Sequence, residues 1–512
     1  MSLIKANAVQ IGQSNTATQN FTLAVPSSPN GTIKLARGNS GATTQDVISV
    51  DASGNVNGLV KSTGSTTARS LANRFADVLN VKDFGAVGDG VADDSTSIQN
   101  AINYCAANSI TLFVQSGVYR LLNYINFPSN INIYGEIGSS FYFDPAMTLS
   151  PNVGGSPKAF YSQNTNNVFI SQIRFYSSAT TSKVIQGVFL NIDQIRLTNC
   201  QFDTFGNATY YAQGLLLFTC TNVFVDGCNF SNCSGDGIAF SNDCANIFIS
   251  NTEASNNDDF GIVFTIDCRK ISVIGCNFLN NTNTNLGCDR CSDVVFSNNV
   301  SEGSAFGIRI ARYVDTADVN SSVVILGNVV RGSTFHGISI VNSEASPFSD
   351  SGYVCVSSNS VYSCAKGIYV GDIENVSVSS NVIYNSTDEA IIVLAFFAGQ
   401  TTSNVSVIGN TIDTAKYGIR QLTNSGTMGK ISVSGNVITN ASIAPLITTN
   451  ADVFDGNTSA NYINVSKSLS FPASVVYTTT ATGGAVTPPA NVYGYISVYL
   501  DGSLKKIPVY NS

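Results

Sequence analysis

Short hydrophobic runs alternate with polar residues through most of the chain, and the pattern repeats with an irregular period. From about residue 168 each unit reads V-x-V-x-x-N-x-φ, then a variable turn and G-I-x-φ, where φ is apolar; Val223–Phe230 followed by Gly237-Ile238 is one example. A period of two predicts strands. Successive units start 22 to 31 residues apart, which matches a coil of three short strands per turn rather than leucine-rich or helical repeats. We therefore expect an all-β chain whose main part is a right-handed, single-stranded parallel β-helix.

Aligning the units on their first apolar residue places polar and thiol side chains in one column. The column contains Cys200, Cys228, Thr252, Cys276, Asn299, Asn328, Asn359, Asn381, Asn410 and Asn436. Stacked amides bond to the turns above and below, so the column predicts a buried Asn ladder. Ten positions imply at least ten turns, or about 43 Å of rod at roughly 4.8 Å per turn.

A second column lies three residues before the first apolar position of the unit. It contains Cys220, Cys244, Cys268 and Cys291. Each turn supplies one Cys, without the paired Cys-x-x-Cys arrangement of a zinc site. The first 22 residues also lack the apolar core of a secretory signal, which would lead to an oxidising compartment. We expect a stack of buried free thiols and no metal ion.

Composition limits the kind of partner. Only 11% of the residues are charged, the net charge is -8, and no dense run of Lys or Arg occurs. The chain therefore lacks the electrostatic footprint of proteins that bind nucleic acids or anionic membranes. No apolar run is long enough to cross a bilayer, so we expect no nucleic-acid partner, no membrane insertion and no cofactor. A weakly charged, sugar-like ligand fits this composition better.

A motif near residue 80 connects the repeat to a known family. Val81–Gly90 reads V-K-D-F-G-A-V-G-D-G, and Asp93–Ile102 reads D-D-S-T-S-I-Q-N-A-I. This run resembles the start of the pectate-lyase-like β-helix superfamily, which includes phage tailspikes and polysaccharide depolymerases. In that family the run is structural, so the resemblance implies turn and helix-cap roles for its aspartates: Asp83, Asp89, Asp93 and Asp94. A phosphate loop would require a Lys-Ser or Lys-Thr after the glycines, and none follows.

The segments outside the repeat suggest how the β-helix ends. In Thr67–Leu79, Leu71, Phe75 and Leu79 lie on one helical face, which predicts a short helix covering the first turn. Gly31–Asn57 resembles the N-terminal region of phage tail fibres and spikes, which implies attachment to a tail adaptor or baseplate protein.

Strand patterns also occur at both ends of the chain. Alternation around Val9–Gln13 and Phe21–Val25 predicts strands near the N-terminus, and alternation within Pro488–Ser512 around Asp501-Gly502 predicts a hairpin. The hairpin resembles the small terminal β-elements by which tailspikes trimerise, which implies a homotrimer. The expected division is 1–65 for tail attachment, 66–130 for the capping helix and first turn, 131–460 for the receptor-binding or substrate-binding β-helix, and 461–512 for the C-terminal β-element.

Three aspartates in adjacent turns are the candidate catalytic residues. Asp236 directly precedes its Gly-Ile strand, and Asp258 and Asp259 lie three and two residues before the same point in the next turn. Because turns are roughly 4.8 Å apart, their carboxyl groups could be about 5 to 9 Å apart, which covers retaining and inverting glycosidases. The alternative is that these aspartates only hydrogen-bond to their own turns.

These segments also resemble motifs of polygalacturonase-type hydrolases in part. Ser234–Gly237, Asn257–Phe260 and Gly307–Ile310 are similar to the N-T-D, D-D and R-I-K motifs. The G-H-G motif expected between the last two is absent, and the His336-Gly337 pair comes after Arg309 instead of before it. Because this motif is absent, the mechanism of the polygalacturonase-type hydrolases is not assigned to this chain.

Substrate-binding residues are predicted on the same side of the coil. Arg309 is expected in the same outward column as Asp289, either as a sugar contact or in a surface salt bridge. His336 is the only histidine, so any imidazole base must be this residue, which we expect to face solvent.

Long turns and aromatic residues add candidates. The two longest steps of the repeat enclose Arg312–Ser322 and Val341–Tyr353, and insertions on one side of a solenoid often wall a groove. Their acidic residues are Asp315, Asp318, Glu344 and Asp350, of which the last two are predicted to bind substrate unless both turns are simply solvated. Without Trp, the sugar-stacking candidates are Phe260, Phe335, Tyr353 and Tyr417.

Two classes of function remain open from the sequence. One is a trimeric spike in the tail of a virion, assembled in the host cytoplasm, which binds capsular or lipopolysaccharide chains and hydrolyses them as an endoglycosidase. The other is a receptor-binding spike with the same ligand and no turnover. A polysaccharide lyase is less favoured, because no cluster of calcium-binding carboxylates with Lys or Arg stands out. A secreted plant-polysaccharide hydrolase is disfavoured by the missing secretory signal.

Overall fold

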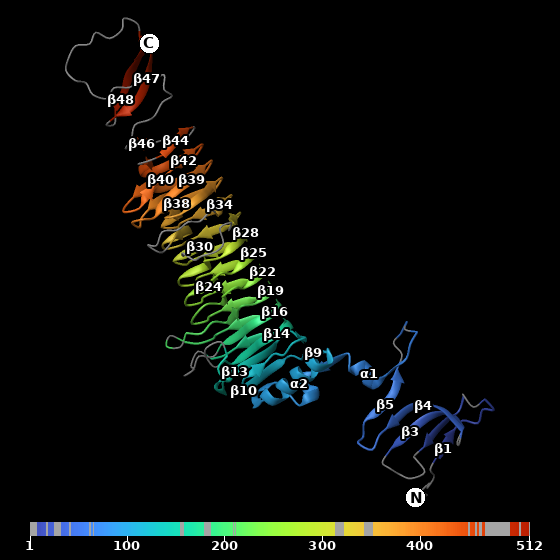
Figure 1. Cartoon of the computed structure of the whole chain (residues 1–512). Helices are drawn as coiled ribbons and strands as arrows, with labels where there is room; N and C mark the ends of the chain where they lie inside the picture. Colours follow the sequence, from blue (N-terminus) through green and yellow to red (C-terminus); the bar gives the residue numbers. More distant parts are fainter. Residues whose placement is uncertain are drawn as a thin grey trace.

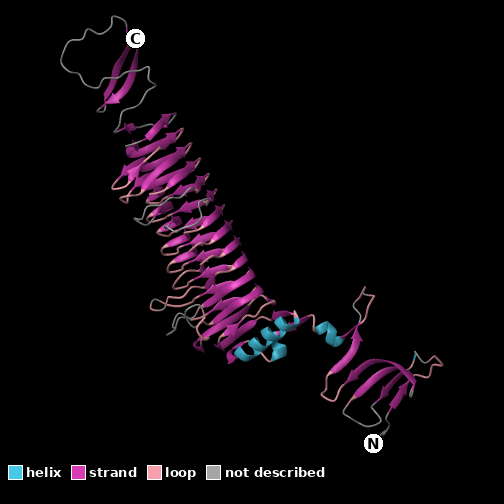
Figure 2. Cartoon of the chain, in the orientation of Figure 1, coloured by secondary structure: helices cyan, strands magenta, loops and turns pink. Residues whose placement is uncertain are grey.

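The computed structural model forms a long rod of stacked strands, with a small antiparallel sheet at the N-terminal end and a hairpin at the C-terminal end (Figure 1). The described helices lie between the N-terminal sheet and the first turns of the rod (Figure 2). The structure describes residues 8–510 except 17–18, 25–31, 40–41, 61–62, 65, 154–157, 179–185, 208, 210, 313–321, 343–351, 449–450, 456–457, 460–462, 466–491 and 501–502.

The rod is a right-handed parallel coil of about 12 turns, as the sequence predicts. Each turn contributes to three parallel sheets, and strands pair with those of the turns before and after them. The first sheet, named here the Gly-Ile sheet after the dipeptide at its strands, carries the candidate residues.

The strands of each sheet have the following bounds. The Gly-Ile sheet contains β11 (Ile125–Asn126), the starts of β14 (Phe160–Ser171) and β16 (Gly187–Thr198), β18 (Leu215–Phe218), β21 (Ile238–Ser241), β24 (Phe260–Thr265), β27 (Thr284–Asp289), β30 (Phe306–Arg312), β33 (His336–Asn342), β36 (Lys366–Gly371), the ends of β38 (Val382–Ala395), β40 (Thr411–Thr423) and β43 (Val437–Thr448), and β46 (Ile463–Val465). The second sheet contains β7 (Val78–Asn80), β9 (Thr111–Val114), β12 (Ile131–Gly135), the ends of β14 and β16, β19 (Thr221–Asp226), β22 (Ala245–Ser250), β25 (Arg269–Ile274), β28 (Ser292–Ser297), β31 (Ser322–Leu326), β34 (Tyr353–Ser357), β37 (Glu374–Ser379), β39 (Thr401–Ile408), β42 (Ile431–Ser434) and β44 (Ala451–Asp455). The third contains β8 (Asp89–Asp93), β10 (Gly117–Asn123), β13 (Ser139–Thr148), β15 (Arg174–Tyr176), β17 (Gln201–Asp203), β20 (Asn229–Ser231), β23 (Glu253–Ser255), β26 (Asn277–Leu279), β29 (Val300–Glu302), β32 (Val329–Arg331), β35 (Ser360–Tyr362), the starts of β38, β40 and β43, and β45 (Thr458–Ser459).

Uncharged side chains fill the coil in columns. From Asn299 to Asn410, each Asn Nδ2 donates to the Oδ1 of the next Asn in the ladder at 2.9 to 3.0 Å. The same Oδ1 also accepts a backbone N–H; for example, Asn328 N donates to Asn359 Oδ1 at 2.9 Å. All twelve cysteines are free, and eleven of them are buried. The predicted Asn ladder and thiol stack are therefore confirmed, and buried amides that bond to each other avoid the cost of unpaired polar groups.

A helix covers the first turn of the coil, but it is not the one predicted for that role. α2 (Ser95–Asn108) packs its apolar side chains, among them Ile98 and Ile102, into the core. The helix predicted over Thr67–Leu79 is reduced to α1 (Leu71–Phe75), which buries no residue. Phe75 is 70% exposed because the chain turns into strand β7 within one turn of helix. The prediction of a lid at this segment was wrong.

The aspartates of the first turn hold backbone groups, as the family resemblance implies. Asp83 accepts a bond from the N-cap backbone of a short 3-10 helix, Asp89 from two following N–H groups, and Asp93 from Ser95. Asp94 does not cap α2, because its side chain accepts bonds from two N–H groups of the preceding turn instead.

Both terminal elements contain the strands expected from alternation. The N-terminal sheet is antiparallel, and its strands are β1 (Ala8–Ile11), β2 (Phe21–Ala24), β3 (Ile33–Asn39), β4 (Ala42–Val50), β5 (Val56–Val60) and β6 (Arg69–Ser70). Near the C-terminus, β47 (Val492–Leu500) pairs antiparallel with β48 (Ser503–Tyr510), which is the predicted hairpin. Within the described residues, no helix has the length and apolarity needed to span a membrane.

Candidate functional site

Each turn of the Gly-Ile sheet has one residue directly before the position that is usually glycine. Strand register places the residues at this position in a single row along the rod, named here the pre-glycine column. The column consists of Gln213, Asp236, Phe260, Thr284, Phe306, His336, Lys366, Glu389 and Tyr417. In Figure 1, β24, β30, β38 and β40 are strands of this sheet.

Asp236 lies directly before β21 and is buried, with 4% of its surface exposed. Its Oδ2 accepts a bond from Gln213 Nε2 at 2.9 Å, and its Oδ1 accepts one from the backbone N–H of Phe260 at 3.2 Å. Burial raises the pKa of Asp236 to about 6; the bonds from Gln213 and Phe260 oppose the shift, and the charge of Asp259 adds to it. A carboxyl group of this kind gains or loses its proton in mildly acidic solution.

Asp259 lies beside this carboxyl group in the next turn, where its backbone N–H bonds to Gly235 O. Its Oδ1 accepts a bond from Asn283 Nδ2 at 2.9 Å, and its Oδ2 accepts one from the Tyr211 hydroxyl at 3.4 Å. Burial and the charges of Asp236 and Asp259 raise the pKa of Tyr211, whose hydroxyl interacts with both carboxyl groups. Tyr211 therefore stays protonated and acts as a donor between the two aspartates.

The turn that carries Tyr211 is held against the turn that carries Asp236. Ser234 Oγ accepts a bond from Ala212 N at 3.0 Å, and Gly235 N donates to Ala212 O at 3.0 Å. A Cβ on Gly235 would lie 2.7 Å from two carbons of the Tyr211 ring. The missing side chain at Gly235 therefore allows the ring to reach the aspartates.

The third predicted aspartate lies apart from this arrangement. Asp258 is exposed, and its side chain makes no hydrogen bond to any described residue. The cluster that the structure brings together is Asp236, Asp259 and Tyr211. Among the described residues no cation forms an ion pair with either Asp236 or Asp259.

Asp289 and Arg309 do not share a column, and this prediction was wrong. Register pairs Arg309 with Gly287 and Asp289 with Ala311, because Asn285 takes the place that Gly has in other turns. Burial raises the pKa of Asp289, and the charge of Arg309 opposes the shift without an ion pair between the two. The Arg309 guanidinium instead lies 5.4 Å from the centre of a neighbouring aromatic ring.

His336 does not face solvent as predicted. It is 7% exposed, its ring stacks on Tyr369 at 4.3 Å, and its Nδ1 lies 3.2 Å from Ser339 Oγ. Burial and the charges of Lys366 and Arg309 lower the pKa of His336 to about 3. The imidazole is therefore neutral near pH 7.

Farther along the column, a charged cluster not anticipated from the sequence surrounds Glu389. Lys366 Nζ lies 2.9 Å from Asp388 Oδ2 and 3.1 Å from Glu389 Oε2. Arg420 lies 2.8 Å from Glu389 Oε1, and Lys416 lies 3.5 Å from Asp388. Glu389 is only 2% exposed, so its charge is buried between two cations.

Several predicted binding residues fall outside the part that the structure describes. These are Asp315, Asp318, Glu344 and Asp350, together with most of the two long turns that carry them. Among the candidate stacking residues, Phe335 is 60% and Tyr353 71% exposed, whereas Phe260 is half-buried. Tyr417 is also half-buried and lies under the side chains of Lys416 and Arg420.

Sequence reasoning missed Tyr211 and Gln213. Gln213-Gly214-Leu215 has the same pattern as Asp236-Gly237-Ile238 one turn later, so aligning the residue before each Gly would have found Gln213. Tyr211 has no such signal, since it lies in an irregular turn and reaches the site only through the fold.

Comparisons with known proteins agree with the fold. A family model described as "Right handed beta helix region" matches residues 186–350, which include Asp236 and Asp259. A mannuronan C5-epimerase of Azotobacter vinelandii is 33% identical over 102 residues, which are 18% of this chain. The match covers 7% of the epimerase, so this chain spans only a small part of that relative's length.

Among solved structures, the A-module of another mannuronan C-5 epimerase from Azotobacter vinelandii is similar in fold. It superposes with a TM-score of 0.50 at 19% identity, over 75% of this chain and 99% of that module. Tailspike protein 3 of bacteriophage CBA120 has a TM-score of 0.40 at 14% identity, over 85% of this chain and 67% of that chain. At 19% identity, the likeness to the epimerase module shows a shared fold.

Proposed function

We propose that the chain is a tailspike that binds a bacterial surface polysaccharide and hydrolyses it with Asp236 and Asp259. The observation that carries this proposal is the pair of carboxyl groups in adjacent turns, one of them buried without a cation and with its pKa raised to about 6. Groups of this kind can act as general acids in mildly acidic solution. The tyrosine hydroxyl between them would orient the pair.

The proposed reaction uses the two carboxyl groups in different roles. Protonated Asp236 donates its proton to the glycosidic oxygen, and the bond between that oxygen and the anomeric carbon breaks. In the direct route, ionised Asp259 accepts a proton from the water whose oxygen bonds to the same carbon. In the covalent route, the Asp259 carboxylate itself bonds to that carbon, and Asp236, now ionised, accepts a proton from the water that displaces Asp259. One water molecule is consumed and one new reducing end forms for each bond cleaved.

A receptor-binding spike without turnover is the second candidate. It is supported by the two hydrogen bonds that already occupy Asp236, because an aspartate in a turn often has this structural role. A polysaccharide lyase is the third and less favoured candidate, and it would release unsaturated sugars that absorb ultraviolet light.

The proposal includes a virion location and a homotrimer. The N-terminal antiparallel sheet would attach to a tail adaptor or baseplate protein, and the C-terminal hairpin would contribute to the trimer contact. Sedimentation analysis of the full chain should give three times the mass of 53.9 kDa. A monomer at micromolar concentration would contradict this part of the proposal.

The cleavage proposal is tested on a host capsular or lipopolysaccharide that the purified full chain binds. New reducing ends should appear with the wild type, and Asp236→Asn or Asp259→Asn should abolish them without changing the affinity. Asp258→Asn is the matched control and should retain cleavage, because its exposed side chain makes no hydrogen bond to a described residue. Undiminished affinity with no turnover in any form, wild type included, would favour the receptor-binding candidate, and ultraviolet-absorbing products would favour the lyase.

A further inference from the structure

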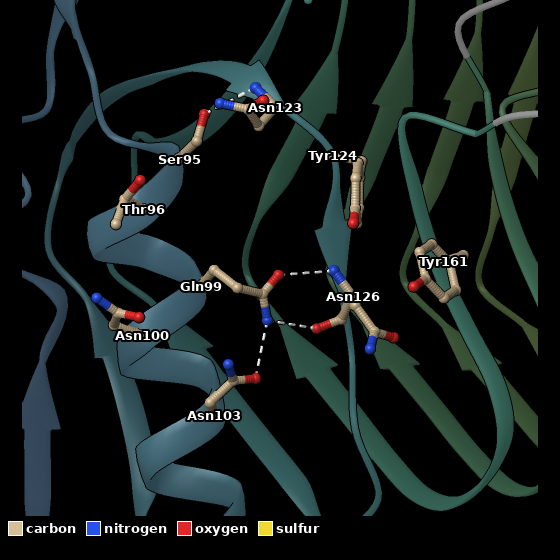
Figure 3. Close-up of a pocket in the computed structure, with 9 residues that line it drawn as sticks. All are labelled: Ser95, Thr96, Gln99, Asn100, Asn103, Asn123, Tyr124, Asn126 and Tyr161. Atoms are coloured by element: carbon tan, nitrogen blue, oxygen red, sulfur yellow. Dashed lines mark hydrogen bonds between the residues drawn. The ribbon is translucent and has the colours of Figure 1, made fainter. Parts of the chain in front are cut away.

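An open groove lies near the N-terminal end of the rod, where α2 passes alongside β11 and the start of β14 (Figure 3). Its volume is about 430 Å³, which falls within the range of small-ligand sites. Asn100 and Asn103 line it from the helix, and Asn126, Tyr124 and Tyr161 line it from the strands. None of the residues that line the groove is charged.

The two tyrosines form the apolar part of the groove. Their ring centres are 5.9 Å apart, the rings are tilted by 36°, and both residues are half-buried. An aromatic surface of this size can pack against the C–H face of a sugar ring, while its hydroxyl groups remain available at the edge.

One side chain of the groove, Gln99, connects its helical wall to its strand wall. Gln99 Oε1 accepts a bond from Asn126 N at 2.8 Å, and Gln99 Nε2 donates to Asn126 O and to Asn103 Oδ1, both at 2.9 Å. These bonds, drawn in Figure 3, fix α2 against β11. The groove is therefore preformed, and its polar groups need little ordering when a ligand binds.

Other polar groups of the groove remain available for a ligand. The side-chain amides of Asn100, Asn123 and Asn126 and the hydroxyls of both tyrosines make no hydrogen bond to any described residue. Amides and hydroxyls both donate and accept, which matches the hydroxyl groups of an uncharged sugar. A uronate or phosphate ligand would instead need a cation to compensate its charge, and the lining has none.

The groove lies on the same sheet as the candidate site but is separate from it. Register places Tyr161 in line with Val188, Leu216 and then Ala239 of β21, so the two sites are three turns, or roughly 14 Å, apart along the rod. Val188 is only 1% exposed, so a ligand cannot lie on the sheet continuously between them.

We propose that this groove is a second carbohydrate site, which binds an uncharged sugar unit of the same polysaccharide that the Asp236 turn acts on. The identity of the polymer rests on the proposed function, whereas sugar binding in the groove does not. Its role is to hold the polymer near the cleavage site by a second contact, which raises the effective concentration of the chain there.

The test uses the full chain labelled with 3-fluorotyrosine and observed by fluorine NMR, with Tyr124→Phe and Tyr161→Phe to assign the two resonances. The probes are maltohexaose, cellohexaose and mannohexaose as uncharged sugars, and a galacturonate hexamer as an anionic one. At least one uncharged hexamer should shift both resonances, and Asn126→Ala should weaken that effect about fivefold through the loss of one hydrogen-bonding group. Tyr134, an exposed tyrosine stacked on Phe113 at the same end, is the matched control and should not respond.

The proposal is overturned if no uncharged hexamer shifts the two resonances, or if the galacturonate hexamer or the Tyr134 control responds equally. It is also overturned if Tyr161→Ala changes the sedimentation coefficient, because the groove would then be covered by a second copy of the chain. Asp236→Asn separates this proposal from the proposed function. Groove binding that persists while no form of the protein cleaves polysaccharide would contradict the proposed function alone, and cleavage without groove binding would contradict this inference alone.

Discussion

Asp236 and Glu389 occupy the same column of the same sheet, and both are buried, yet their surroundings are opposite. Asp236 accepts bonds from an amide and a backbone N–H, whereas Glu389 lies between Lys366 and Arg420. One turn earlier lies Gln213 for Asp236 and Lys366 for Glu389, and Arg420 in the following turn adds a second cation beside Glu389. A parallel coil can therefore make one carboxyl group reactive and another structural by changing the side chains of the adjacent turns.

The pKa shifts follow the same division. Burial raises the pKa of Asp236, and no cation opposes it. Burial also acts on Asp388, next to Glu389, but the hydrogen bond and charge of Lys366 outweigh it, so the pKa of Asp388 is lowered. A buried carboxyl group next to a cation stays ionised, whereas one without a cation exchanges its proton in the acidic range.

Removing the cation from the structural cluster should have the largest effect. Lys366→Met leaves Glu389 paired with Arg420 alone. Breaking a fully buried ion pair costs about 3 to 5 kcal/mol of unfolding free energy, and this is an upper bound here because Arg420 remains. Chemical denaturation followed by circular dichroism measures it. Lys416→Met is the control, because this exposed lysine lies 3.5 Å from Asp388 and should contribute about 0 to 1 kcal/mol. Equal losses of unfolding free energy in Lys366→Met and Lys416→Met would contradict the claim that the buried pair, and not the exposed one, stabilises the fold.

The protonation of Asp236 should make stability depend on pH. Its folded pKa of about 6 lies above the ordinary value of 3.8, so the neutral form stabilises the fold. This stability is fully present below about pH 4 and is lost as the pH rises through 6, a change on the order of 3 kcal/mol. Denaturation curves measured between these two pH values should show the change in the wild type and lack it in Asp236→Asn. A change that persists in the variant would assign it to another group.

Placing a cation beside Asp236 should lower the pKa of its carboxyl group and weaken its role as a general acid. Gln213→Lys puts an ammonium group where Lys366 lies relative to Glu389, and a neighbouring cation lowers a carboxyl pKa by about 1 to 3 units. Cleavage at pH 5 should fall by about twofold for a shift of one unit and by about 90-fold for a shift of three units, because a larger fraction of the general acid is then ionised. Gln213→Met is the uncharged control, and identical pH profiles for the two variants would refute the effect of charge.

Displacing Tyr211 should have the smallest effect. Gly235→Ala places a methyl group 2.7 Å from its ring, which moves the hydroxyl away from Asp259 while both carboxyl groups remain. Losing one orienting hydrogen bond costs about 1 kcal/mol, so cleavage should fall about five- to tenfold, measured as kcat/KM. Gly54→Ala, at φ +85° with no atom within 4 Å of its Cβ, strains only its own turn and serves as a control for local strain from a Gly-to-Ala change, with cleavage unchanged.

The fold could be predicted because its determinants are local and repeated. The alternation of apolar and polar residues predicts the strands. The Asn or Cys that recurs in the turns predicts the buried column, which the structure contains as the hydrogen-bonded ladder from Asn299 to Asn436. The lid was mispredicted because the apolar residues of the expected helix belong to two elements. Leu71 and Phe75 lie in the short helix α1, whereas Leu79 lies in strand β7, which pairs with β9 of the coil.

The candidate site could be predicted only in part. Asp236 and Asp259 were found because they precede a recognisable Gly, whereas the Asp289 column was misassigned because its turn has Asn285 in place of that Gly. Tyr211 could not be found, since an irregular turn brings it to the aspartates. The burial of His336 was also not predicted, because it depends on how its ring stacks on Tyr369 of the next turn, and the repeat pattern does not specify this packing.

The central claim is that the Asp236 carboxyl group takes up its proton near neutral pH because it is buried without a cation. Carbon-13 NMR of protein labelled at the Asp carboxyl carbons tests this directly, with Asp236→Asn used to assign the resonance by difference. The account predicts a titration midpoint near 6 for Asp236. A midpoint at or below the ordinary value of 3.8 would contradict it, and with it the assignment of Asp236 as the general acid.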